Sequence, residues 1–286
     1  MERPSRTELT VPLGAAGLWR PDPGGTVGDD GRDSTVDLTI DTADGTAEAF
    51  VSRPETAEHD VPGVLLFPDI FGLRPQIRTM MDRIASWGYV VLAPNVFYRS
   101  GTVDDLAPTV DLREPGERDG YIAKVFPLME GLTSDLSRPD TAAYLDALLT
   151  LPGVTGDAGV IGYCMGARLA LRAGGDHPDR IATVGGFHGG GLATDESDSP
   201  HLSLAITRAA VLLRHADDDP SMPREVMDVI ASLARESGVP LDQDVYPGAP
   251  HGYSMADTSM YDETAADRHF EDLREHLARR LARHGE

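Results

Sequence analysis

The sequence predicts an α/β fold, with a mostly parallel β-sheet covered by helices on both faces. Two observations favour this class. Short apolar runs recur along the chain, and most of them contain no polar interruption, which is typical of strands buried on both sides. Amphipathic segments of helical length separate most of these runs, which indicates parallel strands joined by helical crossovers. In such a sheet, the loops that carry chemistry follow the carboxyl ends of the strands.

An antiparallel hairpin is expected to begin the sheet. Residues 35–40 and 47–52 alternate apolar and polar side chains around the turn-prone residues 43–45, so both are expected to be edge strands. Further strands are expected at 63–67, 89–93, 158–163, 181–187, 209–214 and 242–246. Helical spacing predicts helices over 75–87 and 265–283, and arginines in the last turns of the second helix suit its dipole.

One α/β domain is expected over residues 34–286. Residues 1–33 contain several prolines and glycines and show no sustained period, so they are expected to form an N-terminal extension. The interval 100–140 is too long for a plain connection and includes the apolar segment 121–132. We expect this interval to be an insertion that forms a small cap over the site.

Composition excludes several classes of protein. The 25 basic and 47 acidic residues give a net charge of −22, which argues against nucleic acid and anionic membranes as partners. Cys164 is the only cysteine, so no intrachain disulfide can form, and a reducing compartment is expected. No signal-like h-region and no run of 18 apolar residues occurs, so a soluble, cytoplasmic protein is expected.

The strongest chemical signal is the pentapeptide Gly162-Tyr163-Cys164-Met165-Gly166, between an apolar strand and a helix-forming segment. A nucleophile elbow has this form, because its central residue sits in a strained turn and side chains two positions away would clash unless they are very small. The helix N-terminus behind the thiol would favour the thiolate. The alternative is that Cys164 is a small buried apolar side chain.

Two further groups follow predicted strands and would complete a catalytic triad. His251 lies in a turn-rich loop after the last strand, where it could serve as the base for the thiol. Asp219 belongs to the acidic run after the preceding strand and is the expected orienting acid. The alternatives for this run are a solvated face or helix-capping turn, or a metal loop with His215, which would make a poor zinc signature. The order Cys164, Asp219, His251 is the nucleophile, acid, histidine order of α/β-hydrolases.

With these residues in place, the sequence resembles the dienelactone hydrolase family, which has an α/β-hydrolase fold and a cysteine nucleophile. The resemblance covers roughly residues 35 to 280. It is carried by residues 68–72 (Pro-Asp-Ile-Phe-Gly), by Gly88-Tyr89 to Pro94 with Arg99 after them, by the elbow, and by the loops around Asp219 and His251. By this resemblance the triad is Cys164, Asp219 and His251.

The resemblance also implies roles for other residues. Backbone N–H groups of Ile70 and Met165 would form the oxyanion hole, which agrees with the need for two fixed donors at the developing charge. Asp69 stands where the family has a glutamate that holds the resting thiol and takes its proton, with a loop-capping carboxylate as the alternative. Arg99 matches an arginine that binds the substrate carboxylate.

One departure from the family pattern concerns the substrate. Family members that act on dienelactones commonly have a second arginine where this chain has Met255, which puts the substrate in doubt more than the reaction. Met255, Phe71 and Tyr253 are expected to contribute an apolar, substrate-binding wall, although such side chains more often belong to the core. His188 either reaches the pocket or closes a turn.

These observations predict a hydrolase that cleaves a small-molecule ester or lactone through a thioester on Cys164, with no cofactor and no metal. Two alternatives stay open. One is an acyltransferase that uses the same triad. The other is a non-catalytic, hydrolase-like binding or thiol redox-sensing protein, against which the intact Asp219 and His251 argue. The natural substrate and the oligomeric state do not follow from the sequence.

Overall fold

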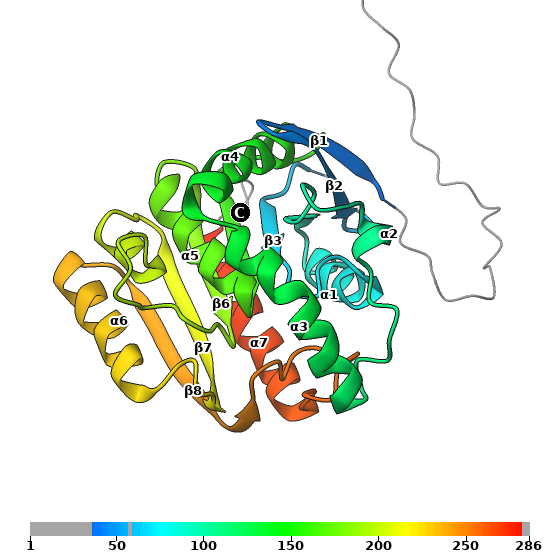
Figure 1. Cartoon of the computed structure of the whole chain (residues 1–286). Coiled ribbons are helices and arrows are strands. Elements are labelled where there is room, and N and C mark those ends of the chain that lie inside the picture. Colours follow the sequence, from blue (N-terminus) through cyan, green and yellow to red (C-terminus); the bar gives the residue numbers. More distant parts are fainter. Residues whose placement is uncertain (1–35, 57–58, 282–286) are drawn as a thin grey trace, which may run out of the picture. The chain divides into compact units, whose positions relative to one another are not determined.

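The computed structural model describes residues 36–56 and 59–281, so the expected N-terminal extension lies outside the described residues. The described residues form an eight-stranded sheet in the order β1-β2-β4-β3-β5-β6-β7-β8 (Figure 1). All strand pairs from β4 to β8 are parallel, and helices follow most of these strands. The predicted α/β class, with a mostly parallel sheet, is confirmed.

Three strands coincide with their predicted bounds, and the others lie within a few residues of them at one or both ends. The strands are β1 Leu38–Thr42, β2 Gly45–Ser52, β3 Gly63–Phe67, β4 Val90–Pro94, β5 Ala158–Tyr163, β6 Ile181–Phe187, β7 Ala210–Asp218 and β8 Leu241–Pro250. The main helices are α1 Pro75–Ala85, α3 Pro115–Gly131, α4 Ser134–Thr150, α5 Met165–Asp176, α6 Arg224–Ser237 and α7 Glu263–Arg280. Strands β7 and β8 continue past their predicted ends because their backbones keep pairing with each other, as far as Asp218↔Pro250.

The predicted hairpin forms, but only one of its strands is an edge strand. β1 and β2 are antiparallel and pair from Leu38↔Ala49 to Thr42↔Gly45. The other side of β2 pairs antiparallel with β4, so β2 is an interior strand. Phe50 of β2 is buried in the core.

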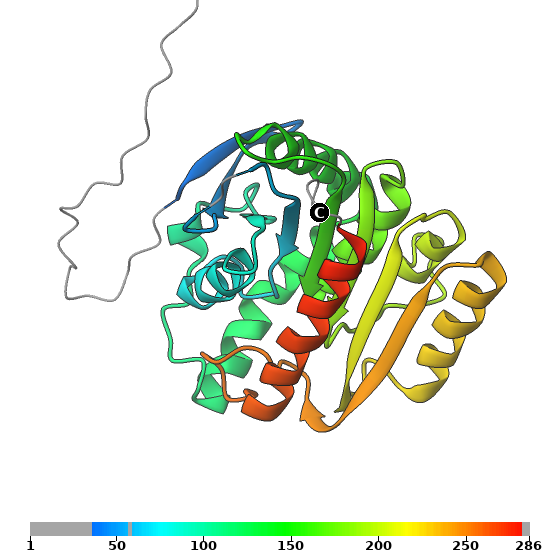
Figure 2. The same cartoon turned by 180° about the vertical axis from the view of Figure 1, so that it is seen from behind.

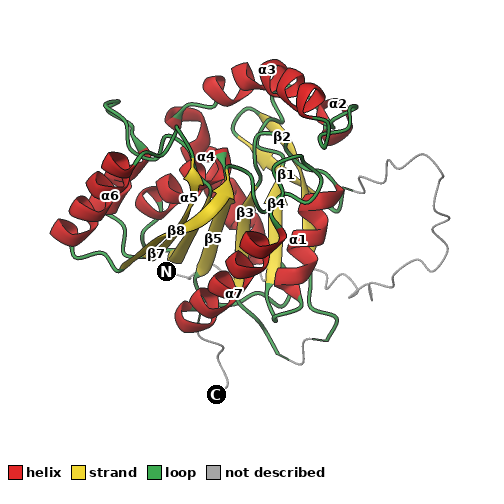
Figure 3. Cartoon of the chain, turned by 90° about the horizontal axis from the view of Figure 1, so that it is seen from below, coloured by secondary structure: helices red, strands yellow, loops and turns green. Residues whose placement is uncertain are grey.

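Helices cover both faces of the sheet (Figure 3). Apolar residues of α4, α5 and α6 join one buried cluster, whereas those of α1 and α7 join another. Alternate residues of β3 supply both clusters, with Leu65 and Phe67 on one face and Val64 and Leu66 on the other. Figure 2 shows α7, in red, lying across the second face. None of the helices in the described part of the chain is long and apolar enough to cross a membrane.

The interval predicted to be an insertion contains α2 (Val103–Leu106), α3 and the start of α4. Tyr121 and Val125 of α3 pack against Ile70 and Phe71, in the loop after β3. Helix α4 instead places Leu145 and its neighbours in the core beside the sheet. Helix α3 is therefore the part of this interval that lies against a loop at the carboxyl ends of the strands.

Candidate active site

Cys164 lies between β5 and α5 with φ of 53°, in the left-handed region that is unfavourable for residues with a side chain. Two glycines make this turn possible. A Cβ atom on Gly162 would come within 2.0 Å of the Gly166 carbonyl oxygen. One on Gly166 would come within 2.3 Å of the Phe67 carbonyl oxygen, on the neighbouring strand β3. The geometry is that of a nucleophile elbow, with the thiol at the N-terminal end of a helix.

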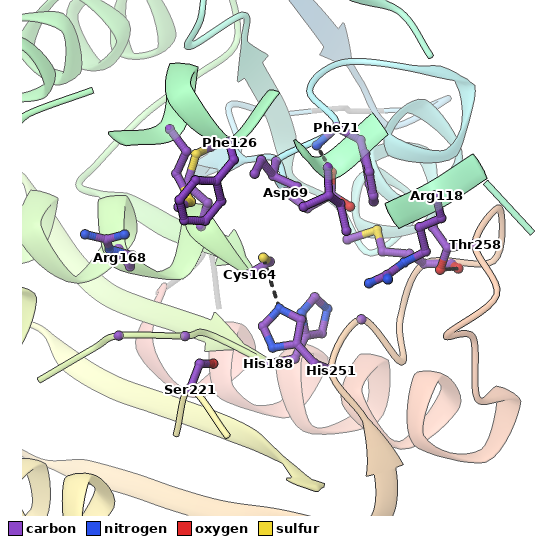
Figure 4. A pocket seen from close by; sticks show the side chains of 18 residues that line it. Asp69, Phe71, Arg118, Phe126, Cys164, Arg168, His188, Ser221, His251 and Thr258 are labelled. Atoms are coloured by element: carbon purple, nitrogen blue, oxygen red, sulfur yellow. Dashed lines mark hydrogen bonds between the residues drawn. The ribbon is translucent and has the colours of Figure 1, made fainter. Parts of the chain in front are cut away.

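Three side chains that are far apart in the sequence form a continuous hydrogen-bonded chain. His251, directly after β8, has its Nε2 3.1 Å from the Sγ of Cys164 (Figure 4). Its Nδ1 lies 2.6 Å from Oδ2 of Asp219, which directly follows β7. The other carboxylate oxygen of Asp219 accepts hydrogen bonds from the hydroxyl of Ser221 at 2.5 Å and from its backbone N–H at 2.9 Å. The carboxylate is therefore fixed on both sides.

The charged groups of this hydrogen-bonded chain stabilise one another. Burial alone lowers the pKa of His251, but negative charge at Cys164 and hydrogen bonds that the imidazole donates to Asp219 and Cys164 outweigh burial and raise the pKa to about 10. For Asp219, burial raises the pKa, yet its bonds to His251 and Ser221 lower the pKa below its usual value. The protonated imidazole is thus stabilised between an acid and a sulfur.

His188 is a neighbour of this chain whose role the sequence left open. It directly follows β6 and is fully buried, with φ of 37°, and its ring lies at 66° to that of His251, with the centroids 5.4 Å apart. Its Nε2 lies 2.7 Å from the hydroxyl of Ser254, in the loop that carries His251. Burial, together with the positive charge of His251, lowers the pKa of His188 well below its usual value. His188 therefore packs as a neutral ring against the base.

The two residues expected to supply the oxyanion donors lie beside Cys164. Ile70 and Met165 both line the cavity that reaches Cys164. Within the described part of the chain, neither of their backbone N–H groups has a hydrogen-bond acceptor. Met165 is the first residue of α5, so its N–H points out of the helix end. Both groups are free to bind a negatively charged oxygen.

The cavity beside Cys164 has a volume of about 320 Å³ and a mostly apolar wall. Helix α3 contributes Ile122, Phe126 and Met129 to it. Phe71 and Met255 line the cavity as the sequence indicated. The arginines that line the cavity are Arg118 of α3 and Arg168 of α5, which lie on different sides of Cys164 (Figure 4). The Nε of Arg168 is buried and has no hydrogen-bond partner among the described residues.

Arg99, which was expected to bind the substrate carboxylate, is not among the residues that line this cavity, and its guanidinium is bound by two carboxylates elsewhere. Its Nη1 lies 2.7 Å from Asp140 of α4, and its Nη2 lies 2.7 Å from Asp44 of the β1–β2 turn. Arg118 and Arg168 could not be predicted from the sequence, because the direction in which an arginine on a helix points depends on which elements pack around that helix.

Tyr253 is also displaced from its expected place. Its side chain is completely buried, and its hydroxyl donates a hydrogen bond to the backbone oxygen of Arg214. The ring packs against His188 with the centroids 4.9 Å apart, and it does not line the cavity. Tyr253 therefore lies in the core behind His188, outside the residues that line this cavity.

Asp69 reaches the cavity, but its carboxylate is bound by another residue. Arg74 donates to both of its oxygens, at 2.6 and 3.0 Å, and the backbone N–H of Phe71 donates to one of them. Asp69 makes no hydrogen bond to Cys164. Burial raises the pKa of Asp69 despite the opposing charge of Arg74. The arrangement resembles the loop-capping alternative more than that of a carboxylate holding the thiol.

Comparison with known proteins places the chain in a family. The family model described as "Dienelactone hydrolase family" matches residues 47–281. This chain belongs to the dienelactone hydrolase family. It is therefore a hydrolase of the dienelactone hydrolase type, as the sequence predicted. No group of three or more His, Cys, Asp or Glu side chains among its described residues could hold a metal ion.

Relatives and solved structures agree with this membership. A carboxymethylenebutenolidase of Rhodococcus opacus is 27% identical over 191 residues, which cover 66% of this chain and 69% of that protein. A structure titled m3DLH has a TM-score of 0.71 at 23% identity and covers 86% of this chain and 97% of its own. The dienelactone hydrolase of Anabaena variabilis has a TM-score of 0.58 at 15% identity, covering 86% and 97%. The chain itself therefore has the α/β-hydrolase fold.

Proposed function

We propose that this family member hydrolyses a small carboxylic ester or lactone through a thioester on Cys164. One observation carries the proposal: the hydrogen-bonded chain from Asp219 through His251 to the Cys164 sulfur ends at a mostly apolar cavity of about 320 Å³. A nucleophile, a base and an orienting acid in this arrangement are what acyl transfer requires.

In the first half of the reaction, His251 holds the proton of the Cys164 thiol while the sulfur attacks the carbonyl carbon. The carbonyl oxygen becomes negative and binds the N–H groups of Ile70 and Met165. When the intermediate collapses, the carbon–oxygen single bond of the ester breaks, and His251 gives its proton to the leaving oxygen. The product is a thioester and a free hydroxyl, which for a lactone stays attached to the acyl group.

In the second half, water releases the acyl group. His251 removes a proton from the water as its oxygen attacks the thioester carbon. A second oxyanion forms at the same two N–H groups, and the carbon–sulfur bond then breaks. The carboxylic acid leaves, and the Cys164–His251 pair is restored with its shared proton. Asp219 stays ionised and stabilises the charged imidazole in both halves.

The proton moves directly between Cys164 and His251 in this proposal. The proton does not pass through Asp69, although the family resemblance suggested that it would, because Arg74 binds both oxygens of that carboxylate. The lining of the cavity favours a mostly apolar substrate. An acidic group on that substrate would meet Arg118 or Arg168 and not Arg99.

The proposal is tested with p-nitrophenyl butyrate and a dienelactone as substrates. The parent protein should turn over at least one of them, and Cys164→Ala and His251→Ala should each lose at least 1,000-fold in kcat. His59→Ala, which removes an exposed histidine, is the matched control and should keep full activity. Intact-protein mass spectrometry should detect the acyl-enzyme with the parent and not with Cys164→Ala.

Three results would reject the proposal. Turnover by Cys164→Ala would remove the thiol from the reaction. A parent protein without turnover would favour the binding or redox-sensing alternative. Ester products in which an added alcohol replaces water, at alcohol concentrations far below that of water, would identify an acyltransferase.

A further inference from the structure

Arg74 is a buried arginine that links two loops of the site. It directly precedes α1, and only 3% of its surface is exposed. Its Nη1 lies 2.6 Å from Oδ1 of Asp69, in the loop after β3. Its Nε lies 2.6 Å from Oδ2 of Asp257, in the segment between β8 and α7. One guanidinium thus joins two loops that are far apart in the sequence.

The donors of Arg74 are used on both sides of its guanidinium. Nη2 donates to the second oxygen of Asp69 at 3.0 Å and to the second oxygen of Asp257 at 3.1 Å. Nη1 also donates to the carbonyl oxygen of Gly72 at 3.1 Å. Two-pronged pairing of this kind fixes orientation as well as distance, because the guanidinium is a rigid plane.

Both linked loops carry groups of the proposed reaction. Asp69 is followed by Ile70, the proposed oxyanion donor, and it also accepts a hydrogen bond from the backbone N–H of Phe71 at 3.1 Å. Asp257 lies on the same segment as His251. Met255, which lies between His251 and Asp257 in the sequence, lines the cavity, and its sulfur is 3.5 Å from Nη2 of Arg74. Arg74 therefore links the loop that carries Ile70 to the segment that carries His251.

We propose that Arg74 is a positioning residue for this hydrolase: with Asp257, it holds the N–H of Ile70 at a fixed place relative to His251. The proposal rests on the proposed function, since it concerns the oxyanion of that reaction. Both tetrahedral intermediates use the same donors, so a loosened loop slows acylation and deacylation alike. Substrate binding in the ground state depends much less on these donors, and the effect falls on kcat.

Asp257→Asn tests the proposal because it weakens the link and leaves the buried pair of Arg74 and Asp69 intact. The side chain of Asp257 is 28% exposed, so this variant is expected to fold. The matched control is Asp267→Asn, which weakens a surface ion pair between α7 and Arg83 of α1. Arg74→Lys is the conservative second variant, which keeps the charge but loses the two-pronged geometry.

We expect Asp257→Asn to lower kcat for p-nitrophenyl butyrate by about 10- to 100-fold, with KM changed less than threefold. Asp267→Asn should match the parent, and Arg74→Lys should lower kcat by at least as much as Asp257→Asn. Alkylation of Cys164 by iodoacetamide needs the Cys164–His251 pair but no oxyanion donor. Its rate should therefore be the same in Asp257→Asn and in the parent.

Two results overturn the inference. One is an Asp257→Asn variant whose kcat equals that of Asp267→Asn. The other is a parallel fall in turnover and alkylation, since the link would then act on the thiol and not on the oxyanion donor. If the parent itself fails to hydrolyse esters, the proposed function fails separately. The link is then judged by hydrogen–deuterium exchange of residues 68–74, which should quicken in Asp257→Asn and not in Asp267→Asn, and unchanged exchange in Asp257→Asn rejects it.

Discussion

Ser221 donates two hydrogen bonds to the same oxygen of Asp219, one from its hydroxyl and one from its backbone N–H. The second oxygen of that carboxylate is thereby left to His251. The space around Ser221 is narrow, because a Cβ atom on Gly190 would come within 2.5 Å of the Ser221 hydroxyl oxygen. Ser221 thus sets the orientation of the acid that orients the base.

Ser221→Ala should lower kcat by about three- to tenfold, because Asp219 keeps the backbone hydrogen bond and loses one bond worth about 1 kcal/mol. The fall should be larger at low pH, since the lost bond helps to keep the pKa of Asp219 low. Steady-state kinetics across pH 5 to 8 measure both effects. Ser232→Ala, which alters a partly buried serine of α6, should leave the profile unchanged.

Folding stability should depend on the protonation of His251. The folded chain keeps this proton up to about pH 10, whereas the unfolded chain releases it near pH 6.5. The stabilisation is complete below pH 6.5 and is lost as the pH rises from 6.5 to 10. Urea unfolding at pH 6.5 and 9.5 should therefore show a loss of a few kcal/mol in the parent. The loss should shrink in His251→Gln and in Cys164→Ala, and an equal loss in all three proteins would refute this origin.

Selectivity for anionic substrates should depend on Arg168 and not on Arg99. Arg168→Gln should lower kcat/KM for a carboxylated ester about tenfold and leave a neutral ester within twofold, because a hydrogen bond to a charged group is worth 1.5–3 kcal/mol. Arg99→Gln should change neither ratio, since Asp140 and Asp44 already bind its guanidinium. Arg138→Gln, which removes an exposed charge, controls for the change in net charge. Equal effects of all three substitutions would contradict the prediction.

Much of the fold follows from local sequence patterns. β3, β5 and β6 were predicted to the residue, because each is a short apolar run whose ends are marked by turn or polar residues. The ends of β7 and β8 were not predicted, because Asp217 and Pro247 read as turn residues although the two strands continue past them. The pairing between β7 and β8 determines where these strands end, and the local composition does not predict that pairing.

In the site too, some residues could be predicted from local sequence, whereas others depend on partners that are distant in the sequence. Cys164, Asp219 and His251 each follow a strand, so topology alone brings them to one edge of a parallel sheet. The arginines could not be assigned in this way. Arg99 pairs with Asp140 and Asp44, which lie 41 and 55 residues away in the sequence. Which cation stays available to a ligand depends on such distant partners, and no sequence pattern reveals them.

The left-handed backbone at Cys164 implies that activity and thermal stability oppose each other at this single position. A glycine would adopt the φ of 53° without steric strain. In other residues a backbone conformation of this kind costs about 1–3 kcal/mol. Cys164→Gly should therefore be inactive and yet melt at a higher temperature than Cys164→Ala, a comparison that calorimetry can make. The nucleophile occupies a place where the backbone alone would favour a residue with no side chain at all.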